Sequence, residues 1–245
     1  MALFAAMLTA LLVFLMSPHV AHWYLLVLTA IAAAALAMRE LSVSDAFVDL
    51  RMLGGNAPLL ATYGRQVLGS TATYAFVYGY TQWLESSRGL SASLAGLVLV
   101  PMFMTAIVVT TMSGRYAEVR AKLIIGSLSM TTACAALLLV GPGTAIWVLL
   151  GIGTLAGMAQ GLNGLANQNA LYRQADPNRM GSAAGLLRTL TYLGAISASA
   201  AIAASFAHGA DTAGLHHMAV FMIASSALLV VVTVLDHSLR RPSTV

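Results

Sequence analysis

The sequence predicts an all-α integral membrane protein with eight transmembrane helices, and three observations carry this prediction. Of the 245 residues, 59% are hydrophobic and only 8% are charged, whereas about a quarter of the residues in soluble domains are charged. Apolar runs of about 20 residues, the length that a helix needs to cross a ~30 Å hydrocarbon core, recur along the chain. The basic residues gather in alternate connections between these runs. The lipid bilayer is therefore the first expected partner.

Eight apolar runs define the predicted membrane spans. They cover residues 1–17, 19–38, 58–84, 92–112, 122–141, 144–171, 180–207 and 215–236. Residues 39–57 mix apolar and charged side chains at helical spacing, which is typical of an amphipathic cytoplasmic segment, although a plain linker fits equally well. We expect two additional helices in 1–38, this linker in 39–57 and a six-helix bundle in 58–245.

The positions of the basic residues predict the orientation of the chain. If the spans alternate, one set of connections holds only Arg88. The other set holds Arg39, Arg51, Arg115, Arg120, Lys122, Arg173, Arg179, Arg240 and Arg241. Short cytoplasmic loops carry an excess of Lys and Arg. We therefore expect a multi-pass protein of the cell membrane with a cytoplasmic C-terminus.

Two stripes of polar side chains fall inside predicted spans, where polar groups are costly. In the span 144–171, Gln160, Asn163 and Asn167 lie on one helical face. These amides suit either hydrogen bonding between helices or the lining of a cavity. On the adjoining face, Gly153, Gly157 and Gly161 recur every fourth residue, which lets a neighbouring helix approach closely.

The span 58–84 carries a similar stripe. Thr62, Gln66, Ser70, Thr73 and Tyr80 share one of its faces. The central members, Gln66, Ser70 and Thr73, are candidates for the lining of a substrate path.

Arg188 is the charged residue inside the span 180–207. On a helix it lies within about 60° of Gly181, Gly185 and Tyr192, and this predicts that it belongs to a packing face of small residues. We expect no carboxylate within the spans to neutralise it. Its partner is then a loop carboxylate, a backbone carbonyl, a ligand or a group outside this chain. Arg188 and Tyr192 are therefore also candidates for the substrate path.

The order of these features resembles the major facilitator superfamily, and specifically its fourteen-span drug:proton antiporters. The stretch GLSASLAGLVLVPMFMTAIVVTTMSGR is similar to a span of that family with the pattern G-x-S-x-x-x-A-G-L-x-x-x-P and a final Gly-Arg turn. The stretch QNALYRQADPNRMGSAAGLLRTLTYLGAISAS is similar to the family's proline-containing loop and the helix after it, and FVDLRMLGGNAPLL gives a weaker match. The resemblance implies that 58–245 is the C-terminal six-helix domain and that the N-terminal one, with the proton-coupling carboxylates, is missing.

The connection SGRYAEVRAK resembles the inner-loop motif of the same family. It keeps Gly114, Arg115, Glu118 and Lys122, in a shorter and looser form. These residues predict either a charge latch at the cytoplasmic face or a simple positively charged loop.

A transporter, or one half of one, is the favoured function. Such a chain would need a small-molecule substrate and either a separately encoded N-terminal half or a second copy of itself. The alternative is a non-transporting membrane fragment or helper subunit. We expect no enzyme, cofactor or metal site, because no metal-ligand spacing or activated nucleophile occurs in the sequence. The basic residues are dispersed as topology signals, so we expect no nucleic-acid partner.

Overall fold

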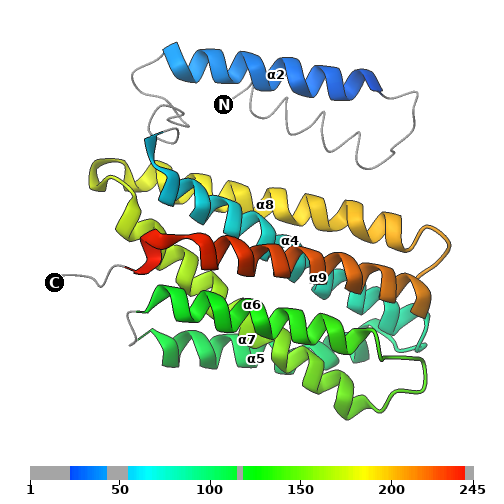
Figure 1. The fold of residues 1–245 in the computed structure, drawn as a ribbon. Helices are drawn as coiled ribbons and strands as arrows, with labels where there is room; N and C mark the ends of the chain where they lie inside the picture. Colours follow the sequence, from blue (N-terminus) through cyan, green and yellow to red (C-terminus); the bar gives the residue numbers. More distant parts are fainter. Residues whose placement is uncertain (1–22, 43–54, 115–117, 241–245) are drawn as a thin grey trace.

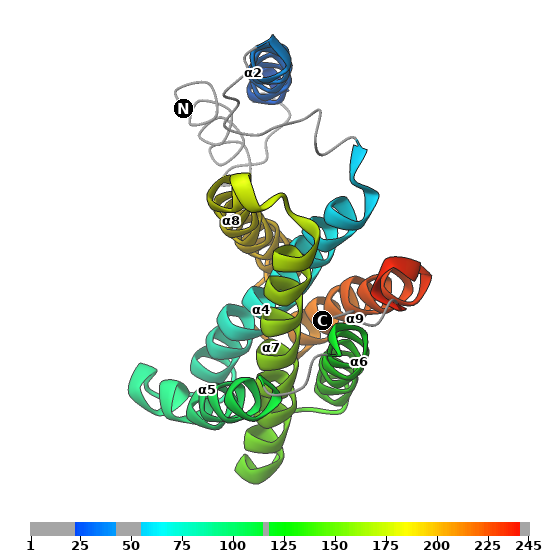
Figure 2. The same cartoon turned by 90° about the vertical axis from the view of Figure 1, so that its left-hand side faces the viewer.

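The structure is a computed structural model that describes residues 23–42, 55–114 and 118–240. These residues contain helices and turns and no strand. The α-helices are α2 (Trp23–Ser42), α4 (Ala57–Ser86), α5 (Ala92–Ser113), α6 (Val119–Leu137), α7 (Ile146–Gln174), α8 (Met180–Ser205) and α9 (Thr212–Leu235). Two 3-10 turns, Pro177–Arg179 and His237–Arg240, flank α8 and α9. Helices α4 to α9 form one antiparallel bundle, and α2 lies beyond α8 in both views (Figures 1 and 2).

The predicted count of eight membrane helices is higher than the structure supports. The described residues form seven α-helices, and the predicted span 1–17 lies outside them. Four segments are long and apolar enough to cross a membrane: Ala92–Ser113, Ile146–Gln174, Pro177–Ser205 and Thr212–Leu235. Helices α4 and α6 lie where spans were predicted. Buried polar residues lower their mean hydropathy, among them Arg65, Ser70, Lys122 and Ser127. The linker 39–57 lies mostly outside the described residues, so the three-part division stays a prediction.

The packing of the bundle has an internal symmetry. Helix α4 packs against α8 and α9, while α7 packs against α5 and α6; in addition α6 contacts α9, and α4 contacts α7. This pattern is unchanged when α4, α5 and α6 are exchanged with α7, α8 and α9. Three antiparallel helices followed by three more, with matching contacts, form an inverted repeat of the kind found in membrane transporters. Helices α4 and α7 are the equivalent central pair.

Several glycines permit close helix contacts within the bundle. A Cβ atom on Gly157 would lie 2.1 Å from the Met102 carbonyl oxygen, and one on Gly161 would lie 2.7 Å from that of Ala106, so α7 touches the backbone of α5 there. A Cβ atom on Gly153 would be in ordinary contact with α5, 3.7 Å from the Val98 oxygen. On α8 the close contact is at Gly194, where a Cβ atom would lie 1.9 Å from Ser70 Oγ.

The packing role predicted for Gly181 and Gly185 is not observed. Both are exposed, and a Cβ atom on either would meet nothing within 4 Å. Small residues occur all around α8, so their spacing does not single out one face, and a packing role for these two glycines outside the described bundle stays a prediction. The buried face of α8 instead consists of Ala183, Gly194 and Ala198.

One end of the bundle, here called the Asp236 end, contains a buried ion pair. Arg65 of α4 is fully buried, and its Nη1 donates to Asp236 Oδ2 at 2.6 Å, just after α9. Its Nη2 donates to Thr62 Oγ1 at 2.6 Å, and the Thr62 hydroxyl donates to Gln174 Oε1 of α7 at 2.6 Å. Ser238 Oγ donates to Asp236 Oδ1 at 2.5 Å. Asp236 is the last residue of the predicted span 215–236, but α9 ends at Leu235, so this carboxylate lies just beyond the helix, where it neutralises Arg65 and not Arg188.

The opposite end, here called the Arg88 end, is held together by its turns. Arg88 follows α4 and donates to the carbonyl oxygens of Pro142 and Thr144, in the connection between α6 and α7. Ser87 donates to the Ala210 carbonyl oxygen at 2.8 Å, in the connection between α8 and α9. The turn after α4 thus joins the other two turns at this end.

The ion pair at the Asp236 end predicts a loss of stability in acid. Burial alone would raise the pKa of Asp236, but hydrogen bonds from Ser238 and Arg65 and the positive charge of Arg65 outweigh burial and lower it. An unperturbed aspartate has a pKa of about 3.9. Because the folded-state pKa lies below the unfolded one, the pair stabilises fully above about pH 4 and is lost as the pH falls through the folded-state pKa. We expect the unfolding midpoint of the wild-type chain to drop between pH 6 and pH 3 by more than that of Asp236→Asn; equal drops would contradict this.

Candidate functional site

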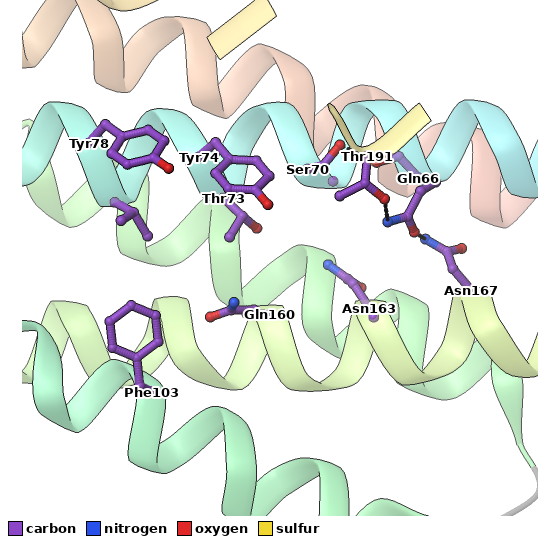
Figure 3. A pocket seen from close by; sticks show the side chains of 13 residues that line it. Gln66, Ser70, Thr73, Tyr74, Tyr78, Phe103, Gln160, Asn163, Asn167 and Thr191 are labelled. Carbon is purple, nitrogen blue, oxygen red and sulfur yellow. Dashed lines mark hydrogen bonds between the residues drawn. The ribbon is translucent and has the colours of Figure 1, made fainter. Parts of the chain in front are cut away.

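A pocket of about 480 Å³ lies between the central helices α4 and α7 and is flanked by α5 and α8 (Figure 3). Its volume is in the range of sites that bind drug-sized molecules. The lining consists of Gln66, Gly69, Ser70, Thr73, Tyr74, Val77, Tyr78, Phe103, Gln160, Asn163, Gly164, Asn167 and Thr191. None of these described lining residues carries a formal charge at neutral pH. The site therefore offers hydrogen bonds and aromatic surface and no charged side chain.

A relay of hydrogen bonds joins three helices at one edge of this pocket. Asn167 Nδ2 of α7 donates to Gln66 Oε1 of α4 at 3.1 Å, and Gln66 Nε2 donates to Thr191 Oγ1 of α8 at 2.8 Å. The Thr191 hydroxyl in turn donates to the Leu187 carbonyl oxygen at 3.0 Å. Figure 3 shows the first two of these bonds. The relay fixes the orientation of Gln66 and links α7 to α8 through α4.

Three amide oxygens of the lining residues are buried without a hydrogen-bond donor. They belong to Gln160, Asn163 and Asn167, which are the residues of the polar stripe predicted on this helix. Buried polar atoms in proteins are nearly always hydrogen-bonded, and each exception calls for an explanation such as a ligand or water. These oxygens have almost no accessible surface, and that of Asn163 faces α6, where a Cβ atom on Gly126 would lie 2.5 Å from it. A ligand in the pocket would therefore reach the oxygens of Gln160 and Asn163 only when their amides turn.

The two ends of the pocket differ in chemistry. The relay and Asn163 lie toward the Asp236 end, whereas Tyr74, Tyr78 and Phe103 lie toward the Arg88 end (Figure 3). The rings of Tyr74 and Tyr78 stack with centroids 5.8 Å apart. The pocket is therefore polar at one end and aromatic at the other.

Six of the eight residues predicted for the substrate path line this pocket: Gln66, Ser70, Thr73, Gln160, Asn163 and Asn167. Arg188 and Tyr192 do not line it. Both are exposed, with 56% of Tyr192 accessible, and no hydrogen bond or ion pair to a described residue is recorded for Arg188. The prediction that Arg188 lies on a packing face is thus wrong for the described bundle, because α8 turns its Gly194 face toward α4.

The polar stripe on α4 also divides into two regions. Thr62 belongs to the ion-pair network at the Asp236 end, and the Tyr80 hydroxyl donates to the Leu149 carbonyl oxygen in the core at 3.2 Å. Sequence reasoning missed Phe103 and Thr191 as lining residues. Neither stands out from its helix by periodicity, and only the packing of α5 and α8 beside the central pair brings them to the pocket.

The residues of the predicted loop motif lie apart from the pocket, at the Asp236 end. Gly114 is the C-cap of α5, Glu118 precedes the first residue of α6 and is exposed, and Lys122 is buried in the first turns of α6. Arg115 lies outside the described residues, so the charge latch stays a prediction. Within the described ranges, no group of three or more His, Cys, Asp or Glu side chains is arranged to hold a metal ion.

A membrane bundle built as an inverted repeat, with an uncharged polar pocket between its central helices, is the architecture of a membrane transporter. Comparisons with known proteins agree with this class. The family model described as Major Facilitator Superfamily matches residues 1–199, and the chain belongs to this superfamily. The chain is also similar to the uncharacterized MFS-type transporter YwoD of Bacillus subtilis (strain 168), with 29% identity over 227 residues. That alignment covers 89% of this chain and 48% of the relative, so the chain spans about half the length of the relative it matches.

Proposed function

We propose that this chain forms one half of the substrate path of a small-molecule efflux transporter of the drug:proton antiporter type. The observation that supports this proposal is the pocket between α4 and α7, with three buried amide oxygens that lack donors. Buried acceptors without donors are rare in proteins, and a bound ligand is one explanation for them. Membership of a transporter superfamily supports the same conclusion.

The proposed transporter needs a second six-helix bundle. Alternating access in this fold rocks one bundle against another around a central site, and the described bundle supplies one side of such a site. We place the second bundle either in another segment of the complete protein or in a second copy of this chain. Because no lining residue of the pocket is a carboxylate, we assign the proton-coupling group to that second bundle.

We propose that the Asp236 end faces the cytoplasm. The helix ends and turns at this end hold Arg120, Arg173 and Arg179, whereas the Arg88 end holds a single arginine among the described residues. An excess of basic residues marks the cytoplasmic side of short loops.

Dye efflux from bacterial cells that lack their major efflux pumps tests the proposed function. Cells that express the membrane assembly containing this chain are expected to accumulate several-fold less 1-N-phenylnaphthylamine, an uncharged fluorescent dye, than cells with an empty vector. A proton uncoupler should abolish the difference. Normal membrane abundance with unchanged dye accumulation would instead favour a non-transporting helper subunit.

Arg188→Ala is expected to reduce efflux by the same assembly several-fold at unchanged membrane abundance. The side chain is exposed on α8, one turn from Thr191 of the relay, and holds no described residue in place. Its loss should therefore affect a contact with substrate or with the second bundle and leave this bundle folded. Arg88→Ala is the matched control, because it removes bonds between turns and should lower abundance. Parallel loss of abundance and efflux in Arg188→Ala would assign Arg188 a structural role.

A further inference from the structure

We propose that the pocket between α4 and α7 selects uncharged molecules in which hydrogen-bonding groups, at least one of them a donor, are attached to an aromatic or apolar body. This inference rests on the proposed function in treating the pocket as a substrate site. It adds the chemical class of the substrate and names Gln160, Asn163 and Asn167 as the residues that determine it.

The direction of the relay makes Asn167 an acceptor. The Leu187 carbonyl at the end of the relay can only accept, so the Thr191 hydroxyl donates to it and accepts from Gln66. Gln66 then uses its amide nitrogen on Thr191 and its oxygen on Asn167. An amide has donors on nitrogen and acceptors on oxygen. Asn167 Oδ1 is therefore left as an acceptor, but its side chain is only 1% exposed, so a ligand would reach it only by displacing the atoms that cover it.

Gln160 and Asn163 are free to adapt to a ligand. The oxygen of each is buried without a donor, that of Asn163 against Gly126 of α6, and no hydrogen bond to a described residue is recorded for either amide nitrogen. The terminal torsions of such side chains are broad, so each amide can turn to present its oxygen or its nitrogen. A ligand with adjacent donor and acceptor groups would form hydrogen bonds with both the oxygen and the nitrogen of such an amide.

The charge distribution disfavours ionic ligands. In the bundle formed by α4 to α9, the described carboxylates lie near the ends of helices, at Glu85, Glu118, Asp176, Asp211 and Asp236. None of them lines the pocket. Moving a full charge from water into a site without an opposite charge is costly, whereas a neutral donor is compensated by an amide oxygen. The stacked rings of Tyr74 and Tyr78 offer a surface for the apolar body of the ligand.

Binding of three matched probes to the purified chain in lipid nanodiscs tests this inference. The probes are tritiated N-(4-hydroxyphenyl)benzamide, its N,O-dimethyl analogue without donors, and an analogue with a trimethylammonium group in place of the hydroxyl. We expect the first probe to bind about tenfold more tightly than either analogue, which corresponds to one hydrogen bond to a buried acceptor. Empty nanodiscs correct for partitioning into lipid.

Variants locate the preference in the amides. Gln160→Leu should lose about tenfold in affinity for the donor probe, while Gln168→Leu, which alters an exposed glutamine on the same helix, should lose none. Asn163→Asp and Gln160→Glu each place a carboxylate in the pocket and should shift the preference toward the trimethylammonium probe. Circular dichroism identifies any variant that fails to fold. If one of the two charge variants does not fold, the probe preference of the other one provides the test.

Equal affinities for all three probes, or a preference of the wild-type chain for the cationic probe, would overturn the inference. Failure of all three probes to bind would also overturn it. Because binding is measured on the chain alone, this result is independent of dye efflux. Failure of efflux with selective binding would refute the proposed transport and leave the ligand class in place.

Discussion

Asp236→Ala is expected to destabilise the bundle by about 3–5 kcal/mol, the range found when one partner of a buried ion pair is removed. The side chain of Arg65 is 0% exposed and that of Asp236 is 9% exposed, so little water would replace the lost carboxylate. Arg65 Nε already lacks a hydrogen-bond partner. The variant would thus leave a buried guanidinium without its counter-charge, between the first and last helices of the bundle.

The chain contains its own reporter for this experiment. Cys134 is its single cysteine and is fully buried in α6. Its reaction with a thiol-activated fluorophore during heating in detergent therefore follows unfolding of the bundle. Asp176→Ala, which changes an aspartate in a turn at the same end, should shift the midpoint far less. The double replacement Arg65→Met with Asp236→Leu should recover most of the stability. A midpoint for Asp236→Ala equal to that of wild type would show that the pair is not structural.

Gly157→Ala should have the second largest effect. Its new methyl group would lie 2.1 Å from the Met102 carbonyl oxygen and 2.8 Å from the carbonyl carbon, both backbone atoms that cannot rotate away. Helices α5 and α7 must then separate, and overpacking of this kind costs about 1–3 kcal/mol. Since Phe103, next to Met102, lines the pocket, the same shift should also weaken binding of the donor probe.

Gly164→Ala is the matched control for this prediction. It makes the same chemical change on the same helix, seven residues along, but its methyl group would meet nothing within 4 Å. Alanine favours a helix over glycine by up to about 1 kcal/mol, so this variant should be neutral or slightly stabilising. If both variants lower the unfolding midpoint of the Cys134 reaction equally, the close contact between α5 and α7 is not what makes Gly157 necessary.

The sequence predicted the helices of the bundle well and their apolar character less well. Long periodic runs are sufficient to place α4 to α9, with ends within a few residues of those observed. What it could not provide was the choice of packing face where several faces are alike. On α7 Gly157 and Gly161 meet α5, as their spacing with Gly153 predicted, but on α8 small residues surround the helix and Gly181 and Gly185 meet nothing.

The candidate site was predictable to the extent that it lies on the two central helices. The amides of α7 and the stripe on α4 converge because these helices are the symmetric pair at the centre of the bundle. Thr191 and Phe103 were missed because they enter from flanking helices with ordinary local patterns. The pairing of Arg65 with Asp236 was missed for a related reason: the residues are 171 positions apart, and nothing in their local sequence connects them.

The unequal ends of the pocket impose a direction on whatever occupies it. The amides of Gln66, Asn163 and Asn167 lie toward the Asp236 end and the aromatic rings toward the Arg88 end, and both ends lie along α4 and α7. An amphiphile bound there would stand along the membrane normal, with its hydrogen-bonding head toward one aqueous phase and its apolar tail toward the other. With the proposed orientation the head faces the cytoplasm, so a molecule leaving outward would travel tail first.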